Sequence, residues 1–463
     1  MAMEEKTNMK EKNIVQQSVR KTILHLAIPS FVAQLVSILY NMVDRIYLGK
    51  IEGEGTMILA GLGLTLPIIT MINAFANLVG LGGSPLVAIA LGRKDKKEAE
   101  KILGNSAILL GILAVFVTVS LLISGESLLY LLGATEETID YAVKYLRIYT
   151  IGSVFVMCSL GLNSFLLTQG FNKISMRNQC IGATINIVLD PVFIYGLHLG
   201  IEGAAIATVI SQGVCSVLIL NFLLGKKTNI QLKWIPLEKN IVKKITALGF
   251  STFFWNVSES LVQIVFFRKL LQYGSPLDVT AMTLIFSIST YTSLPSSGIH
   301  QGAQPVISYS YGAGDKKSLK ESIQMLILAD VICCWLAMLV VEIFPESLFR
   351  MFTDDSKVIS LGVHGIRTYF LGRVLMGIHG GLQEMFRSIG YAKSAIYISF
   401  VRKGVLLIPL ALILPELWGL GTDGVYIAEA ITDNLTAVNA VIVFLLLRKK
   451  IFGGSMENSV QLK

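Results

Sequence analysis

Two aspartates stand inside apolar stretches of the first half of the chain. Asp44 lies in YNMVDRIYLG and Asp190 lies in NIVLDPVFIYG. A charged side chain at the centre of a membrane helix costs about 2.5–3.5 kcal/mol on insertion scales, so both carboxylates need an explanation in chemistry or in structure. A pair of buried carboxylates can take up a proton or a small hard cation, and that is the chemistry these residues suggest.

Polar groups that could complete such a site surround Asp190 in the sequence. Asn186 stands four residues before it, on the same face of a helix. Pro191 donates no backbone hydrogen bond, which leaves a carbonyl of the preceding turn free. Thr208 lies in the next apolar stretch, at a similar depth when a helix rise of about 1.5 Å is counted for each residue. The predicted site for a proton or a small hard cation comprises Asp44, Asn186, Asp190 and Thr208.

Each ionisable group also has a structural alternative. Asp44 could pair with its neighbour Arg45, and Asp190 could cap or stabilise a helix kink. In the second half, Glu259 is a candidate for cation coupling or for binding the charge of a substrate; its alternative is a buried ion pair. Glu429 and Asp433 lie four residues apart, on one helix face, and have the same alternatives.

Composition places these residues in a membrane protein. The chain has 463 residues, of which 53% are hydrophobic and only 15% are charged, whereas soluble domains carry about 25% charged residues. Twelve apolar segments are each long enough to span a bilayer. They are residues 24–48, 57–90, 102–124, 139–167, 176–197, 200–224, 243–267, 279–309, 321–344, 358–386, 394–415 and 423–447.

Charged residues alternate between the loops that join these segments. If both termini are cytoplasmic, most of the 39 Lys and Arg fall on the cytoplasmic side, including clusters in 226–244 and 387–403, while the outer loops carry acids. This asymmetry follows the positive-inside rule and predicts a multi-pass protein of the cell membrane. No basic stripe interleaved with aromatic residues is present, so we expect a lipid bilayer and not nucleic acid as the partner.

The chain repeats itself at an offset of 220 in residue number. GRKDKK (92–97) matches GAGDKK (312–317), Gly170 matches Gly390, and Arg147 matches Arg367; LGIEG (199–203) matches LGTDG (420–424) at an offset of 221. Charged and loop residues share the match, so apolar composition does not explain it. The repeat predicts an all-α membrane protein of twelve helices in two pseudosymmetric six-helix lobes. The predicted parts are an N-terminal cytoplasmic segment (1–21), an N-lobe (22–225), a lobe linker (226–242), a C-lobe (243–448) and a cytoplasmic tail (449–463).

Five stretches of the sequence, given at the end of this paragraph, closely resemble the MATE (multidrug and toxic compound extrusion) transporters. The resemblance covers about residues 20–450 and implies that Asp44, Asn186, Asp190 and Thr208 form an N-lobe cation site. Some members also use acids in helices 7 and 10; Glu259 matches the first approximately, and the second has no counterpart here. LTQGFNK departs from the family pattern after the fourth segment. The stretches are YNMVDRIYLG, GLGGSPLVAIALGRKDKKEAEKILGNS, LNSFLLTQG, NIVLDPVFIYGLHLGIEGAAIATVISQ and GIHQGAQPVISYSYGAGDKK.

The resemblance implies a monomeric antiporter that is not an enzyme and has no cofactor. It would export amphipathic, often cationic, drugs or metabolites by alternating access, driven by H⁺ in preference to Na⁺. One alternative is a lipid-linked oligosaccharide flippase of related fold, in which we would expect a strongly cationic cleft. The other is a membrane-embedded enzyme, which would need a nucleophile–base pair or a metal cluster.

Overall fold

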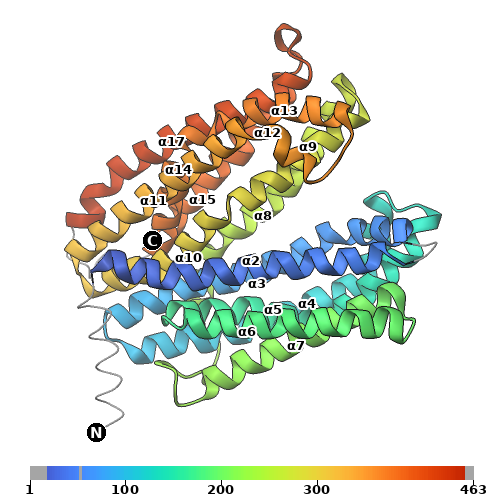
Figure 1. The fold of residues 1–463 in the computed structure, drawn as a ribbon. Coiled ribbons are helices and arrows are strands. Elements are labelled where there is room, and N and C mark those ends of the chain that lie inside the picture. The colour runs from blue at the N-terminus through green and yellow to red at the C-terminus, as the bar shows by residue number, and fades with distance from the viewer. Residues whose placement is uncertain (1–17, 52–54, 454–463) are drawn as a thin grey trace. The chain divides into compact units, whose positions relative to one another are not determined.

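The computed structural model describes residues 18–51 and 55–453, and the regular structure of this part of the chain is helical (Figure 1). The chain divides into two compact units. The first unit is Ile28–Phe253, and the described part of the second unit combines residues 18–27 with residues 254–453. Most of the predicted N-terminal segment (1–21) and cytoplasmic tail (449–463) lies outside the described residues.

The first unit is built from long helices that run side by side in Figure 1. Helix α5 packs against α3, α4 and α7, so it stands at the centre of the unit. After α7 the predicted lobe linker folds back onto the same unit, where Lys233 pairs with Glu100 at 2.6 Å. The helices are α2 (Val19–Gly49), α3 (Gly55–Gly92), α4 (Lys96–Leu131), α5 (Glu136–Thr168), α6 (Asn172–Pro191) with the π-helical turn η1 (Val192–Gly196), and α7 (Gly200–Leu224).

The second unit repeats this pattern with more interruptions. Helix α14 packs against α11 and α17, as α5 packs against α4 and α7. The helices are α8 (Lys239–Tyr273), α9 (Pro276–Thr292), α10 (Leu294–Ala313), α11 (Lys316–Ile343), α12 (Pro345–Arg350), α13 (Ser356–Phe370), α14 (Arg373–Ser388), α15 (Ala392–Phe400), the π-helical η2 (Val401–Leu407), α16 (Ile408–Ile413), the short 3₁₀ turn η3 (Leu417–Gly419) and α17 (Thr422–Gly453).

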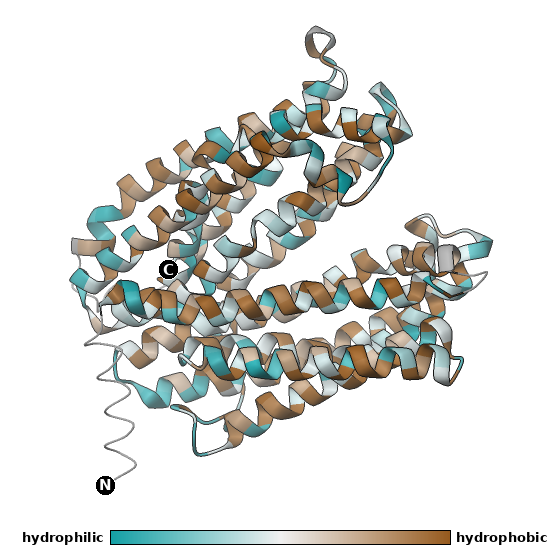
Figure 2. Cartoon of the chain, in the orientation of Figure 1, coloured by the Kyte–Doolittle hydropathy of each residue, from teal (hydrophilic) through white to brown (hydrophobic). Residues whose placement is uncertain are grey.

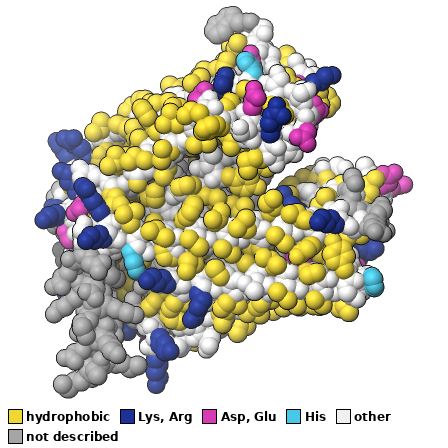
Figure 3. All heavy atoms as spheres, viewed as in Figure 1, with side chains coloured by type: hydrophobic (Ala, Val, Ile, Leu, Met, Phe, Trp, Pro, Cys, Tyr) yellow, Lys and Arg dark blue, Asp and Glu magenta, His cyan; other side chains and the backbone are white. Residues whose placement is uncertain are grey.

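The predicted membrane segments correspond to these helices, which in most cases extend beyond the predicted ends. Among the described residues, nine helices are long and apolar enough to cross a bilayer. The other predicted segments are α8, which carries several charged residues, and the pairs α9–α10 and α13–α14, each of which is interrupted near its middle. Hydrophobic residues run along the helices, and they cover most of the face seen in Figure 3 (Figures 2 and 3). A surface of this kind is unusual for a soluble monomer.

The sequence repeat is visible in the backbone. Asp95 and Asp315, which are related by the offset of 220, both cap helices: Asp95 accepts a hydrogen bond from the Glu98 backbone, and Asp315 accepts from Ser318. The hydrogen bonds from Ser318 lower the pKa of the Asp315 carboxyl. Gly170 and Gly390 occupy the left-handed region at φ 81° and 78°. Such positions favour glycine, which explains why the repeat keeps it there.

Candidate functional site

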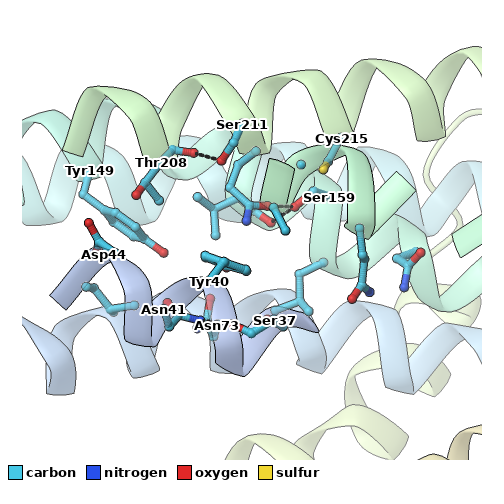
Figure 4. Close-up of a pocket in the computed structure, with 18 of the residues that line it drawn as sticks. Ser37, Tyr40, Asn41, Asp44, Asn73, Tyr149, Ser159, Thr208, Ser211 and Cys215 are labelled. Carbon is cyan, nitrogen blue, oxygen red and sulfur yellow. Dashed lines mark hydrogen bonds between the residues drawn. The ribbon is translucent and has the colours of Figure 1, made fainter. Parts of the chain in front are cut away.

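A cavity of about 290 Å³ lies among α2, α3, α5, α6 and α7 of the first unit. Figure 4 shows Asp44 from α2 and Thr208 from α7 at one end of this cavity, beside Tyr149. Most other polar groups on the wall are neutral amides and hydroxyls, and of the described residues that line it only Asp44 and Arg45 carry a charge. The cavity is therefore polar, with a carboxylate at one end.

Asp44 is buried and forms no ion pair with any described residue. Only 8% of the residue is exposed, and its Oδ1 atom has no hydrogen-bond partner among the described residues. The predicted alternative was an ion pair with Arg45. The Arg45 guanidinium attracts the Asp44 carboxylate, but the Arg45 side chain is exposed and makes no ion pair with Asp44 in the described structure. Adjacent residues of a helix point about 100° apart, which explains the separation. A buried carboxylate in this state favours the binding of a proton or a cation.

Asn186 and Asp190 form a second buried layer. The Asn186 amide donates a hydrogen bond of 3.1 Å to Asp190 Oδ1, as their spacing of four residues predicts. Both residues are almost completely buried, and neither Asp190 Oδ2 nor Asn186 Oδ1 has a partner in the described part of the chain. They are not on the cavity wall, but Asp190 lies close enough to Asp44 for the two carboxylates to repel one another.

The structure thus places the four predicted residues in two groups: Asp44 and Thr208 at the cavity, and Asn186 with Asp190 behind it. Their atoms are carboxylate, amide and hydroxyl oxygens, which are the donors that a hard cation prefers. Among the described residues, no group of three or more His, Cys, Asp and Glu gathers as a metal centre. The oxygen set suits a proton or a monovalent cation better than zinc or another soft metal.

Sequence reasoning missed two tyrosines beside this site. Tyr145 and Tyr149 line the cavity from α5, and their rings stack with centroids 6.0 Å apart. The signal was available, because residues four apart share one face of a helix. Their hydroxyl groups add donors and acceptors next to Asp44.

The second unit holds a different arrangement. Lys403 donates to Glu259 at 2.5 Å, and Arg402 donates to Glu429 at 2.7 Å and to Asp433 at 2.6 Å. Glu259 therefore has the ion-pair partner that its structural alternative required.

The assignment of Arg402 and Lys403 to a cytoplasmic cluster (387–403) was wrong. Both side chains are buried, 4% and 2% exposed, at the start of η2. Their charges are retained inside the unit because three carboxylates surround them, and a buried charge requires such partners. Both residues also lie inside the predicted apolar segment 394–415, which was the signal against a loop.

Comparison with known proteins identifies the fold and the family of the chain. The MatE family model matches residues 29–192 and 252–413. The chain is 26% identical over 441 residues to the multidrug export protein MepA of Staphylococcus saprophyticus, an alignment that covers 94% of this chain and 96% of the relative. MepA of Staphylococcus aureus is 24% identical over 438 residues, with 94% and 95% covered.

Solved structures give the same result. An outward-facing multidrug resistance MATE transporter of the MOP superfamily matches with a TM-score of 0.88 at 26% identity, covering 95% of this chain and 97% of that one. A MOP superfamily transporter from Pyrococcus furiosus matches with a TM-score of 0.87 at the same identity and coverage. These matches confirm the predicted fold of twelve helices in two lobes. Because the family model covers well over half of the sequence, the chain belongs to the MATE family of transporters.

Proposed function

We propose that this transporter exports amphipathic, often cationic, small molecules across the cell membrane in exchange for H⁺, or alternatively Na⁺. The relatives named as multidrug export proteins support the substrate class. The observation that carries the ion coupling is the set of buried oxygens without partners at Asp44, Asn186 and Asp190. As a MATE transporter the chain is a membrane protein and not an enzyme.

Coupling follows from the electrostatics of this site. When Asp44 and Asp190 are both ionised, they repel each other and leave buried oxygens without partners, so this state is unstable unless a cation is bound. A proton or Na⁺ removes the repulsion and changes which packing of α2, α6 and α7 is favoured. An ion gradient can then bias the two access states, because an ion shifts a conformational equilibrium by its difference in affinity for the two states.

We further infer that the transporter acts as a monomer with both termini in the cytoplasm. The basic residues outside the buried cluster of the second unit support this orientation. The flippase alternative is less favoured, because the described cavity of the first unit carries a carboxylate at its end and the buried Arg402 and Lys403 of the second unit are paired with acids.

Dye efflux from proteoliposomes under separately imposed proton and sodium gradients tests the proposal. Asp44→Asn and Asp190→Asn are expected to lower gradient-driven efflux by about tenfold or more, within the usual range of coupling energies. Glu126→Gln is a matched control, because Glu126 is half-exposed and pairs with Arg147 on the surface. Parental efflux rates in both aspartate variants would show that the proposed ion site is wrong.

A further inference from the structure

The packing of the helices fixes how the two units correspond. A side chain at Gly152 of α5 would meet Val209 of α7, and a side chain at Gly372 of α14 would meet Ala430 of α17. The pairs 152/372 and 209/430 give offsets of 220 for α5 and α14, and of 221 for α7 and α17. Helices α6 and α15 begin after equivalent caps, Phe171 and Tyr391, which are again related by the offset of 220.

Helices α2 and α8 can be aligned in the same way. A side chain at Gly82 would meet Gly249 of α8, and a side chain at Gly302 would meet Ala27 of α2. Gly82 and Gly302 are related by the offset of 220, so Ala27 corresponds to Gly249 and the offset for these helices is 222. With this offset, Glu259 corresponds to Ser37.

The charges of the cluster around Arg402 and Lys403 fall on positions that line the cavity of the first unit. Five residues of that cavity wall, all small or neutral, have charged counterparts. The pairs are Ser37 and Glu259, Gly182 and Arg402, Ala183 and Lys403, Thr208 and Glu429, and Gln212 and Asp433.

The cations in the second unit are held closely. Arg402 bridges Glu429 and Asp433, and Lys403 binds Glu259. The ring of Trp255 lies 4.9 Å from the Arg402 guanidinium and 4.8 Å from the Lys403 ammonium, a cation–π arrangement that favours positive charge at this place. Glu259 is the carboxylate with the greatest access, since 38% of its side chain is exposed.

We propose that Arg402 and Lys403 are tethered cations that fill the second unit's counterpart of the cavity beside the ion site, so that this unit binds no coupling ion. Lys403 is the residue that decides this, because it makes the direct ion pair with the accessible carboxylate of Glu259, whereas Arg402 and Arg373 act on that carboxylate without an ion pair in the described structure. An ammonium attached to the chain is present at high effective concentration and does not leave when the external Na⁺ or H⁺ concentration changes. The inference rests on the proposed function only in taking Asp44 as the ion site of the first unit.

The inference is tested by removing the tethered charge. Lys403→Met keeps the length of the side chain and exposes Glu259 to solvent cations. Lys403→Ala introduces the alanine that the first unit has at the equivalent position, Ala183. Each is made in the Asp44→Asn background, purified in detergent, and unfolded by heat across a sodium series at constant ionic strength and across a pH series. A ligand that binds only the folded state raises the unfolding temperature.

We expect either variant to gain a sodium-dependent or proton-dependent rise of several degrees that the Asp44→Asn protein lacks. Adding Glu259→Gln should abolish the gain, and Lys403→Arg, which keeps the charge, should not produce it. A response equal to the background, or a gain that persists after Glu259→Gln, would overturn the inference. A variant that merely lost a structural ion pair would be less stable at every sodium concentration and every pH.

A second measurement needs no change at Lys403. Radioactive sodium, or proton uptake on acidification, is measured on the purified parent and on Asp44→Asn. If the inference is correct, the Asp44→Asn protein shows no saturable binding of sodium or protons through Glu259. Saturable binding by Asp44→Asn that disappears when Glu259→Gln is added would contradict the inference. Normal efflux by Asp44→Asn would instead refute the proposed function, without bearing on the charge of the second unit.

Discussion

The buried carboxylates around the cavity of the first unit and those of the Arg402–Lys403 cluster in the second unit are satisfied in opposite ways. In the first unit Asp44 and Asp190 each have a buried oxygen without a hydrogen-bond partner in the described part of the chain, and a cavity opens beside Asp44. In the second unit, Glu259, Glu429 and Asp433 are paired with two basic residues on one turn of η2. The same helical arrangement therefore supports an open ion site in one half and a closed ion-pair cluster in the other.

The difference depends on two small residues. Gly182 and Ala183 line the cavity at the positions where the second unit has long cationic side chains, and a side chain at Gly182 would meet Cys215. A repeat can thus keep its helix packing while the electrostatic role of one half changes. We expect the first unit to respond to ions and the second unit to act as a fixed partner.

Converting the first unit into the second should give the largest effect. Ala183→Lys places an ammonium on the cavity wall that holds Asp44, as Lys403 does for Glu259. We expect gradient-driven efflux to fall to the level of Asp44→Asn, because a tethered charge replaces the exchangeable ion. Ala183→Met, similar in length but neutral, is the control for steric filling. Equal loss in both variants would mean that volume, not charge, is responsible.

Breaking the cluster of the second unit should produce the largest change in stability. Arg402→Ala leaves Glu429 and Asp433 buried without their partner, and removing one member of a buried ion pair costs about 3–5 kcal/mol. The free energy of unfolding in detergent measures this loss. Arg402→Lys keeps the charge but loses the forked geometry, so a smaller loss is expected. A loss below about 1 kcal/mol for Arg402→Ala would indicate that the cluster is open to water.

The features that the sequence predicts correctly are local or periodic. Segment lengths and apolar composition predict the helices, the ordered matches predict the repeat, and a spacing of four residues predicts the Asn186–Asp190 contact. These follow from residues that are near one another along the chain or that recur at a constant distance.

The cluster of the second unit could not be predicted in the same way. Lys403 meets Glu259 across 144 residues, and no local pattern specifies that pairing. The charge rule that assigns basic residues to cytoplasmic loops gave the wrong place for Arg402 and Lys403, because it takes no account of buried partners. The cavity has a similar origin, since it depends on how five helices pack together.

Close packing at the repeat-equivalent glycines gives a test of intermediate size. Gly152→Ala would place a methyl group against the side chain of Val209, and Gly372→Ala would place one 2.8 Å from the Cα atom of Ala430. Overpacking of this kind costs about 1–3 kcal/mol, measured as a loss of unfolding free energy.

The two glycines should differ in rescue. Adding Val209→Ala is expected to restore the unfolding free energy that Gly152→Ala loses, because it removes the methyl groups that clash. Ala430→Gly should not restore Gly372→Ala, because the obstacle there is backbone. Rescue of both variants, or of neither, would contradict the assignment of a side-chain obstacle at Gly152 and a different kind of obstacle at Gly372.

The smallest effect is expected where the units are most alike on their surfaces. Arg147 pairs with Glu126 at 3.3 Å, and its counterpart Arg367 pairs with Glu342 at 3.5 Å. Both arginine side chains are more than half exposed, at 67% and 53%, so each ion pair should contribute only about 0–1 kcal/mol. Arg147→Ala and Arg367→Ala should therefore change the unfolding free energy slightly and equally, and leave efflux intact. A clear loss of efflux in only one of the two variants would mean that the surface ion pairs of the two units, like their buried charges, have different roles.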